Sequence, residues 1–416
     1  MRMAAGVPLV LGLCASGLVF TLGADHGQPA APDAGTYAVP EQLAGYSYVT
    51  GSVSSSPPGP AVALFQHGFG VELMDFPQAV VLGAGGDSYR RVDVAEDRAG
   101  AETQGDPAPM LLSPDGRYVA VGDHDAGGSA PDVAVVDLTT GTTSTYDLPQ
   151  GRSVIPVAFS SDVGRLALLL TDEPTNPYSG GRITGDVGVL DLEDGSTDVL
   201  DLGGAAAGAA FSPDGTELAV ERAAPRELSV TTLAAGSERT LPLDGVLAGP
   251  NAWSPDGRLL AVTTVDATTA APGVGDPGVP TGLAFVDATG AGAELPDPLT
   301  LPVSAPGRVL AWNGDDEVVM LLSTDAEEAT LSDVPLDGSE PETLMRMADL
   351  GSYGVGRFQL AADAGGRLEV VDAGDVDRGP WPLALRITAS VLAGLLVWVL
   401  AAVAVRFGRR VSRRQA

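Results

Sequence analysis

Leu112-Ser113-Pro114-Asp115-Gly116, Phe211-Ser212-Pro213-Asp214-Gly215 and Trp253-Ser254-Pro255-Asp256-Gly257 are three copies of one motif, in which an apolar residue precedes Ser-Pro-Asp-Gly. Each copy is followed by a segment rich in apolar residues, such as Arg117-Tyr118-Val119-Ala120-Val121. Proline fixes φ at the first corner of a turn, aspartate bonds back to the backbone, and glycine adopts the positive φ at the exit. The motif therefore predicts a tight turn between two β-strands, with its aspartates serving the turn rather than catalysis.

The motif recurs at a regular interval. Weaker copies begin near Phe159, Trp312 and Leu360, so that successive copies are 42 to 59 residues apart. A second motif of alternating residues follows in register, each time before a glycine-containing turn, at residues 132–138, 186–192 and 227–233. Repeats of roughly 40 to 50 residues that hold several strands are typical of propeller blades. We therefore expect four strands in each blade, with the inner pair joined by Ser-Pro-Asp-Gly.

The two ends of the repeat region are less regular. Residues 59–96 are predicted to form an earlier blade with a degenerate inner hairpin, and residues 357–371 supply only the inner strands of a last blade. Residues 37–53 could provide the missing strands, since closing a ring with strands from both termini covers its last sheet edges. The sequence thus predicts an all-β propeller of about seven four-stranded blades over residues 37–375, with six or eight blades as alternatives.

These repeats resemble the WD40-like and TolB-like propeller repeats, and the resemblance covers residues 37–372. The chain as a whole is similar to membrane-anchored WD40-repeat proteins of high-GC bacteria. It departs from eukaryotic-type WD40 repeats because no Gly-His pair and no Trp-Asp pair closes the strands. The resemblance implies a propeller fold and a habit of binding, and it carries no catalytic residue.

Both ends of the chain carry apolar runs. Residues 1–24 have the layout of a secretory signal peptide, with an uncleaved anchor as the alternative, and a linker follows at 25–36. Residues 387–405 lack any charge and are long enough to cross a hydrocarbon core of ~30 Å. The sequence therefore predicts a transmembrane helix at 387–405, preceded by a juxtamembrane linker at 376–386.

Charge sets the expected orientation. Five arginines lie in the tail at 406–416, and the positive-inside rule places such a tail in the cytoplasm. We therefore expect a single-pass or two-pass protein of the cell membrane, with the propeller on the extracytoplasmic side. Between residues 25 and 378 there are 16 arginines, no lysine and 54 acidic residues, so that this region repels phosphate and is not expected to bind nucleic acid.

Two long loops are the candidate binding region. The loops at 171–185 in the third blade and 265–281 in the fifth flank a short loop at 221–226, so they are predicted to form the walls of one site. The first loop holds four candidate binding residues, of which Tyr and Arg are frequent anchors: Asp172, Glu173, Tyr178 and Arg182. For 265–281, which is mostly Ala, Thr, Gly and Pro, we favour the alternative of a low-complexity insertion.

A second cluster is a candidate metal site. Asp123, His124 and Asp125 could bind a metal ion if another blade supplied further ligands, although one histidine with two neighbouring carboxylates is more often a solvated loop. Acidic turns at 191–194 and 315–317 could bind calcium weakly, but they lack the spacing of a dedicated calcium loop. No other cofactor is expected.

Enzyme signatures are absent from the sequence: there is no Gly-x-Ser-x-Gly, no His-Glu-x-x-His and no lysine for a phosphate-binding loop. We therefore expect a non-enzymatic module that binds a protein or cell-envelope component through its loop-bearing face. The alternatives are a metal-dependent, lactonase-like propeller hydrolase and a calcium- or carbohydrate-binding envelope protein. Acidic and histidine side chains that converge on the channel mouth would favour the hydrolase, and a flat or acidic mouth would favour docking.

Overall fold

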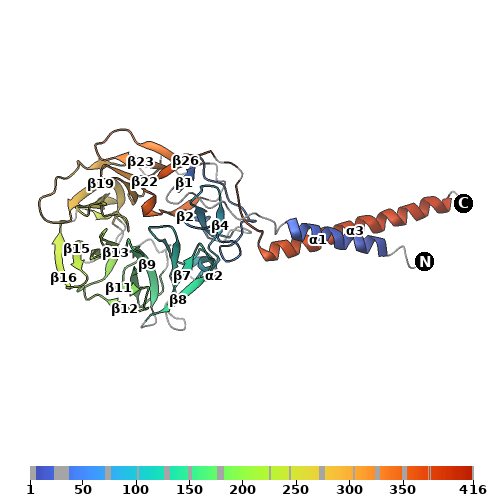
Figure 1. Cartoon of the computed structure of the whole chain (residues 1–416), viewed down its shortest axis with the longest axis horizontal. Coiled ribbons are helices and arrows are strands. Elements are labelled where there is room, and N and C mark those ends of the chain that lie inside the picture. Colours follow the sequence, from blue (N-terminus) through green and yellow to red (C-terminus); the bar gives the residue numbers. More distant parts are fainter. Residues whose placement is uncertain are drawn as a thin grey trace.

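The computed structural model describes residues 6–22, 37–70, 76–100, 103–125, 132–148, 152–175, 182–223, 226–242, 245–270, 277–302, 305–323, 328–348, 354–372, 374 and 376–414. Within them, six four-stranded antiparallel sheets stand around a central channel (Figure 1). The predicted all-β propeller is confirmed, and its blade number is six, which is one of the two predicted alternatives to the favoured seven.

The first blade is formed, from the channel outward, by β25 (Val355–Leu360), β2 (Ala61–His67), β3 (Gln78–Gly83) and β4 (Tyr89–Arg91). The other five blades follow in chain order, each from its innermost to its outermost strand: β5 (Met110–Leu112), β6 (Tyr118–Val121), β7 (Asp132–Asp137) and β8 (Thr143–Asp147); β9 (Ser153–Phe159), β10 (Arg165–Thr171), β11 (Asp186–Asp191) and β12 (Thr197–Val199); β13 (Ala206–Phe211), β14 (Glu217–Ala223), β15 (Arg226–Thr232) and β16 (Ser237–Leu241); β17 (Val246–Leu247), β18 (Leu259–Asp266), β19 (Val279–Asp287) and β20 (Leu299–Thr300); β21 (Val309–Asn313), β22 (Glu317–Ser323), β23 (Ala329–Pro335) and β24 (Glu342–Met347).

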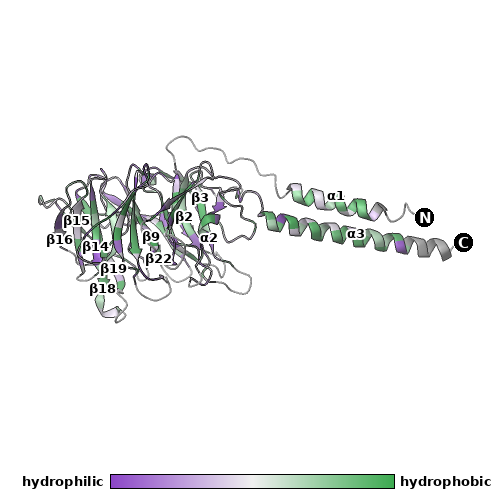
Figure 2. Ribbon diagram, turned by 90° about the horizontal axis from the view of Figure 1, so that it is seen from below, coloured by the Kyte–Doolittle hydropathy of each residue, from purple (hydrophilic) through white to green (hydrophobic). Residues whose placement is uncertain are grey.

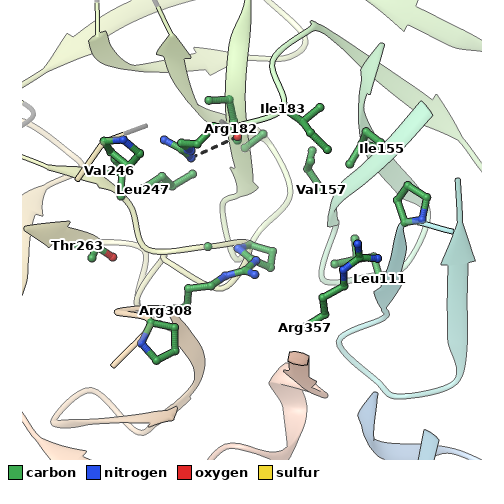
Figure 3. A pocket seen from close by; sticks show the side chains of 18 of the residues that line it. Leu111, Ile155, Val157, Arg182, Ile183, Val246, Leu247, Thr263, Arg308 and Arg357 are labelled. Carbon is green, nitrogen blue, oxygen red and sulfur yellow. Dashed lines mark hydrogen bonds between the residues drawn. The ribbon is translucent and has the colours of Figure 1, made fainter. Parts of the chain in front are cut away.

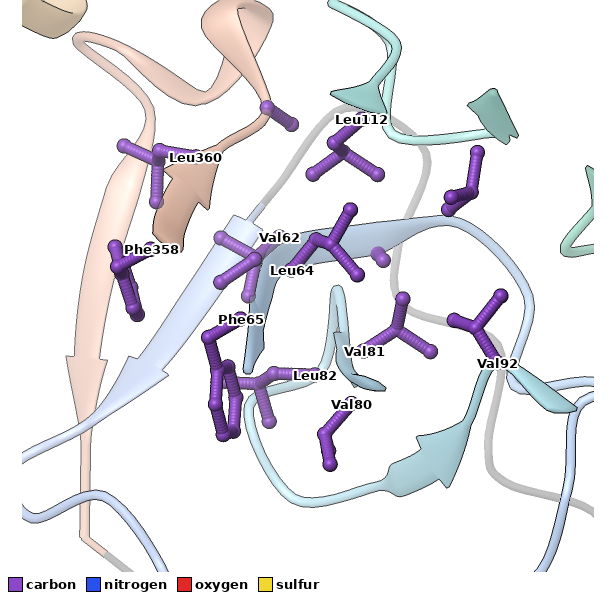
Figure 4. Packing of buried hydrophobic residues seen from close by; sticks show 14 of the residues in the cluster. Val62, Leu64, Phe65, Val80, Val81, Leu82, Val92, Leu112, Phe358 and Leu360 are labelled. Carbon is purple, nitrogen blue, oxygen red and sulfur yellow. The ribbon is translucent and has the colours of Figure 1, made fainter. Parts of the chain in front are cut away.

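The first blade closes the ring with strands from both ends of the propeller. β25 pairs with β2 in antiparallel register, Ala63 opposite Leu360, and the ring of Phe65 stacks on that of Phe358 with centroids 6.0 Å apart. Figure 4 shows the apolar side chains that pack around this junction. The blade count of seven was too high because residues 59–96 and 357–371 were assigned to two incomplete blades, whereas they form one.

Two further strands lie outside the blades. β1 (Tyr37–Pro40) pairs in parallel with β26 (Leu368–Val371), so that the N-terminal stretch does meet the C-terminal one, although in a separate two-stranded sheet. Of the hairpin expected in the first blade, residues 62–65 belong to β2, and residues 71–75 lie outside the described residues.

The Ser-Pro-Asp-Gly motifs form the predicted inner turns. In the second blade, the Ser113 hydroxyl donates to Asp115 (2.6 Å) and accepts from the amide of Tyr118 (2.9 Å), while Gly116 has φ +68°. The turn at Asp214 is built in the same way, and the hydrogen bond from Ser212 lowers the pKa of that carboxyl. These aspartates are therefore committed to the turns, as predicted.

The core consists of apolar layers between neighbouring blades. Four clusters of buried residues each span two or more adjacent blades, and one of them joins Val81 of the first blade, Val119 of the second and Val319 of the sixth. Each sheet therefore buries both faces against its neighbours, and the ring provides a rigid frame for the loops at its two faces.

Two apolar helices leave the edge of the disc side by side (Figures 1 and 2). They are α1 (Gly6–Leu22) and α3 (Leu383–Arg414), and within the described residues only the Leu383–Phe407 part of α3 is long and apolar enough to cross a membrane. Small residues lie at their interface: the Ser16 hydroxyl donates to the carbonyl of Ser390 (2.8 Å), and Gly12 faces Gly394. α3 begins at Leu383, before the predicted span at 387–405, and continues to Arg414, within the predicted tail.

The segment before α3 is fixed to the propeller. Arg90 of β4, whose side chain is fully buried, donates to the Asp377 carboxylate (2.8 Å) and to the carbonyl of Ser56 (2.9 Å). The Arg378 guanidinium lies over the ring of Tyr89, 5.6 Å from its centroid. Part of the predicted juxtamembrane linker is thus attached to the first blade.

A short helix, α2 (Asp93–Asp97), follows β4, and two 3-10 turns lie at Ala267–Thr269 and Ala362–Ala364.

Candidate functional site: an arginine-lined cavity at the channel mouth

The channel widens into a cavity of about 490 Å³ at one face of the disc. We call this the loop face, because the loops between second and third strands and those between blades emerge there. Residues of both long loops, Arg182 and Ile183 of the third blade and Val265 and Pro277 of the fifth, line this one cavity. The described parts of the two long loops thus meet at one cavity.

Three arginines enter the cavity from three different blades (Figure 3). Arg182 follows β10, Arg308 precedes β21, and Arg357 lies on β25. No Asp or Glu is among the described residues that line the cavity, although the region from 25 to 377 holds 54 of them. The mouth is therefore hollow and basic, which is neither the acidic, histidine-rich mouth expected of a hydrolase nor the flat or acidic one expected of simple docking.

Arg182 is held in place by an ion pair with Glu221 of β14. Glu221 is 1% exposed and also accepts a hydrogen bond from the amide of Leu247 (2.9 Å). A second guanidinium nitrogen of Arg182 donates to the carbonyl of Ala207 (3.3 Å). Because both partners belong to the neighbouring fourth blade, the Arg182 side chain is part of the cavity wall.

Arg308 differs from the other two arginines. Among the described residues it has no hydrogen bond or ion pair, and its side chain is exposed to the cavity while the blades surround it. Burial and the nearby Arg182 charge both lower its pKa, but a guanidinium ordinarily titrates so far above neutrality that it stays cationic. Gly249, at φ +105°, leaves room for it, since a Cβ there would lie 3.4 Å from Nε of Arg308.

Arg357 and His124 also line the cavity. Arg357 donates to the carbonyl of Pro107 (3.2 Å). His124 is 1% exposed, with Nδ1 2.7 Å from the Thr175 hydroxyl. Burial, reinforced by the Arg357 charge, lowers the pKa of His124 to about 4, so the imidazole is neutral at pH 7. Its Nε2 is buried and has no hydrogen-bond partner among the described residues.

The predicted binding residues are separated by the structure. Arg182 lines the cavity, whereas Asp172 and Glu173 are exposed outside it, and Tyr178 lies outside the described residues. The Asp172 carboxylate pairs with Arg152 at 2.8 Å, and the Glu173 carbonyl accepts a hydrogen bond from Ser153. Of the three described candidates, only Arg182 is placed to touch a ligand in the channel mouth.

The predicted metal residues are not arranged as a ligand set. The Asp123 carboxylate accepts from the amide of Asp125 (2.8 Å), and His124 turns inward to Thr175. In the described part of the chain no group of three or more His, Cys, Asp or Glu is placed to hold one metal ion. The structure therefore lends this prediction no geometric support.

Arg308 and Arg357 were missed by reasoning from the motifs alone. The sequence does contain a signal for them, which appears when the six inner strands are aligned on the first, apolar residue of each turn motif (Leu112, Phe159, Phe211, Trp253, Trp312 and Leu360). Three positions earlier the blades carry Pro109, Pro156, Gly208, Pro250, Val309 and Arg357; four positions earlier they carry Ala108, Ile155, Ala207, Gly249, Arg308 and Gly356. A charged residue in a column that is otherwise small or apolar marks the channel wall.

The state of His124 gives a testable pH dependence. In the unfolded chain a histidine gains its proton below about pH 6.5, whereas in the folded protein His124 resists protonation until about pH 4. The unfolded state thus binds more protons in this window, and stability is lost as the pH falls. Wild type should have a higher free energy of unfolding than His124→Asn at pH 7.5. We expect this difference to decrease by on the order of 2 kcal/mol when the pH is lowered to 4. Urea unfolding at several pH values measures it, and a pH-independent difference would contradict a buried neutral imidazole.

Fold and cavity together define this chain as a six-bladed β-propeller with a basic pocket at one channel mouth. No protein-family model and no curated protein matches it. Solved structures show distant similarity in fold. TolB from Acinetobacter baumannii is 15% identical with a TM-score of 0.48, over 72% of this chain and 67% of that one. A putative TolB from Agrobacterium tumefaciens is 15% identical with a TM-score of 0.38, over 69% of this chain and 90% of that one. The β-propeller domain of Cps50 (Swd1) from Myceliophteria thermophila is 13% identical with a TM-score of 0.38, over 58% and 72%.

Proposed function

We propose that this protein is a membrane-anchored, extracytoplasmic binding module, and that its loop-face cavity is the ligand site. The support is one observation: the two long loops, Arg182, Arg308 and Arg357 meet in a single cavity on a rigid ring. Pockets with an apolar wall and a few convergent polar groups are the usual form of a ligand site. The ligand is then a component of the cell envelope or a protein segment that enters the channel mouth.

Binding rather than catalysis is the activity that we propose. The described wall of the cavity offers arginines, a neutral histidine and apolar side chains, but no carboxylate to act as a general acid or base. No feature of the described residues favours the hydrolase alternative.

The helices suggest how the propeller is presented. With α3 across the membrane and its basic end in the cytoplasm, the disc stands on its edge, because both helices leave in the plane of the disc (Figures 1 and 2). Both mouths of the channel then face sideways, where a ligand reaches them without obstruction. α1 packs against α3 through small residues, as transmembrane helices commonly do, and we propose that it is retained beside α3 as part of the membrane anchor.

Helix packing is tested by a matched pair of glycines. A Cβ at Gly12 would lie 2.8 Å from the carbonyl oxygen of Gly394, whereas a Cβ at Gly17 would meet nothing within 4 Å. With Cys14→Ser as background, we expect Ser16→Cys and Ser390→Cys to form a disulfide on oxidation in membranes. Adding Gly12→Leu should reduce the crosslinked fraction severalfold, and adding Gly17→Leu should leave it unchanged. A chain that lacks its first residues, or equal effects of the two leucines, would refute the retained helix pair.

The ligand site is tested by pull-down of the tagged full chain from its native membrane after crosslinking. Ile183→Glu places a carboxylate on the wall of the loop-face cavity, and Ser161→Glu places one on the opposite, turn-bearing face, where Ser161 is exposed. We expect a partner that wild type and Ser161→Glu capture and Ile183→Glu loses. If Ile183→Glu still captures the partner and Ser161→Glu does not, the ligand site lies on the turn-bearing face and the proposal is contradicted.

A further inference from the structure

We infer that the loop-face cavity binds a small amphipathic anion, with one carboxylate or phosphate group on Arg308 and an apolar body against the facing wall. This inference rests on the proposed function and specifies the chemistry of its ligand. The first argument is charge. Arg308 has no hydrogen bond or ion pair among the described residues, and it lies in a cavity whose described lining contains no acidic residue.

The second argument is the arrangement of the arginines. Arg182 is fixed by Glu221 and the carbonyl of Ala207, and Arg357 donates to the carbonyl of Pro107. Arg308 lies in the same cavity (Figure 3), and its donors have no hydrogen-bond or ion-pair partner among the described residues. A guanidinium presents a planar fork of N–H groups that matches a carboxylate or phosphate in two parallel hydrogen bonds. Arg308 is therefore the anion-binding residue, whereas Arg182 and Arg357 are engaged by partners in the cavity wall.

The third argument is the rest of the wall. The side chains of Ile155, Val157 and Ile183 line the cavity across from Arg308, and those of Val246 and Leu247 line it beside Arg182 (Figure 3). A volume of about 490 Å³ suits a small organic molecule. An apolar wall beside one available cation thus selects a molecule with an apolar body and an anionic end.

The fourth argument is the charge of the whole propeller, which limits how much negative charge a ligand can carry. Residues 25–378 hold 16 arginines against 54 acidic residues, so a polyanion is repelled as it approaches. A ligand with a single anionic group meets far less repulsion and gains the local attraction of the arginines. Nucleic acids and polyphosphates are therefore disfavoured.

The test measures binding of phenyl phosphate, benzoate and the neutral benzamide to the full chain in nanodiscs by titration calorimetry, with empty nanodiscs subtracted. At least one of the two anions should bind at least tenfold more tightly than benzamide, and their ratio distinguishes phosphate from carboxylate recognition. Arg308→Gln should weaken the anion by about tenfold or more, and Arg308→Lys should retain part of the affinity. The control is Arg346→Gln, which removes the same charge from an exposed site on β24 and should change affinity less than about twofold.

Three results would overturn the inference: no binding of either anion at millimolar concentration, equal binding of benzamide, or equal losses in Arg308→Gln and Arg346→Gln. Thermal melting of each variant verifies that it is folded, and Arg308→Lys guards against a purely structural effect. If both anions fail while the pull-down still depends on Ile183, the inference fails and the proposed function stands. If benzoate or phenyl phosphate binds through Arg308 but the pull-down finds no loop-face partner, the anion site stands and the docking of a partner fails.

Discussion

Replacing Gly116 by Ala should lower the free energy of unfolding by about 4 kcal/mol, whereas Gly257→Ala, at the same position of an identical turn, should lower it by about 1 kcal/mol. Both glycines have positive φ, +68° and +72°, so alanine is strained at each. At Gly116 a Cβ would also overlap the carbonyl oxygen of Ala61, whose amide donates to the carbonyl of Gly116 at 2.7 Å. At Gly257 the nearest atom would be Cδ of Pro213 at 3.8 Å.

The comparison isolates contact between blades from turn geometry. Gly116 belongs to the second blade and Ala61 to the first, so relief of the overlap requires the two blades to move apart at the point where the ring closes. Urea unfolding of the two variants, followed by circular dichroism, gives the difference directly. Equal losses at Gly116 and Gly257 would mean that the first two blades do not pack as closely as the structure shows.

Arg182→Ala should cost about 3 kcal/mol of stability, because it leaves the Glu221 carboxylate buried without its counter-charge. Glu221 is 1% exposed, so water reaches it poorly once the guanidinium is gone. This loss of stability is at the lower end of the range for breaking buried ion pairs, because the Arg182 side chain is itself 26% exposed to the cavity. Thermal and urea unfolding both measure it.

A double variant separates this electrostatic cost from lost packing. Arg182→Met together with Glu221→Gln removes both charges, and the glutamine oxygen can still accept the hydrogen bond from the amide of Leu247. We expect the double variant to recover at least half of the stability lost in Arg182→Ala. A double variant as unstable as Arg182→Ala would show that Arg182 stabilises the wall by packing alone.

The fold was predictable because its signal is local and repeated. Ser113, Asp115 and Gly116 determine a turn through bonds within five residues, and the same bonds recur in the other blades. The blade number was not predictable from this signal. The strand that completes the first blade is about 300 residues away in the chain. The sequence of residues 355–360 is equally compatible with the first strand of a new blade and with the innermost strand of the first blade.

The site was predictable only in part. The long loops indicated the face at which the cavity opens, and Arg182 lines the cavity, but exposed loop residues such as Asp172 lie outside it. Arg308 and Arg357 lie at or beside the inner strands, and their meeting depends on how six blades close around one axis. That closure is a long-range property, so only an alignment of the blades by position could have singled them out.

The most direct test of the binding-module proposal is photo-crosslinking from single positions in the native membrane. A photoreactive residue that replaces Ile183 lines the loop-face cavity. One that replaces Ser161 lies on the turn-bearing face and is the matched control. Mass spectrometry of the tagged full chain then identifies any adduct. We predict an adduct at position 183 that is absent at 161 and is lost when Arg308→Gln is added. An adduct at 161 alone, or equal adducts at both positions, would contradict a ligand site at the loop-face mouth of the channel.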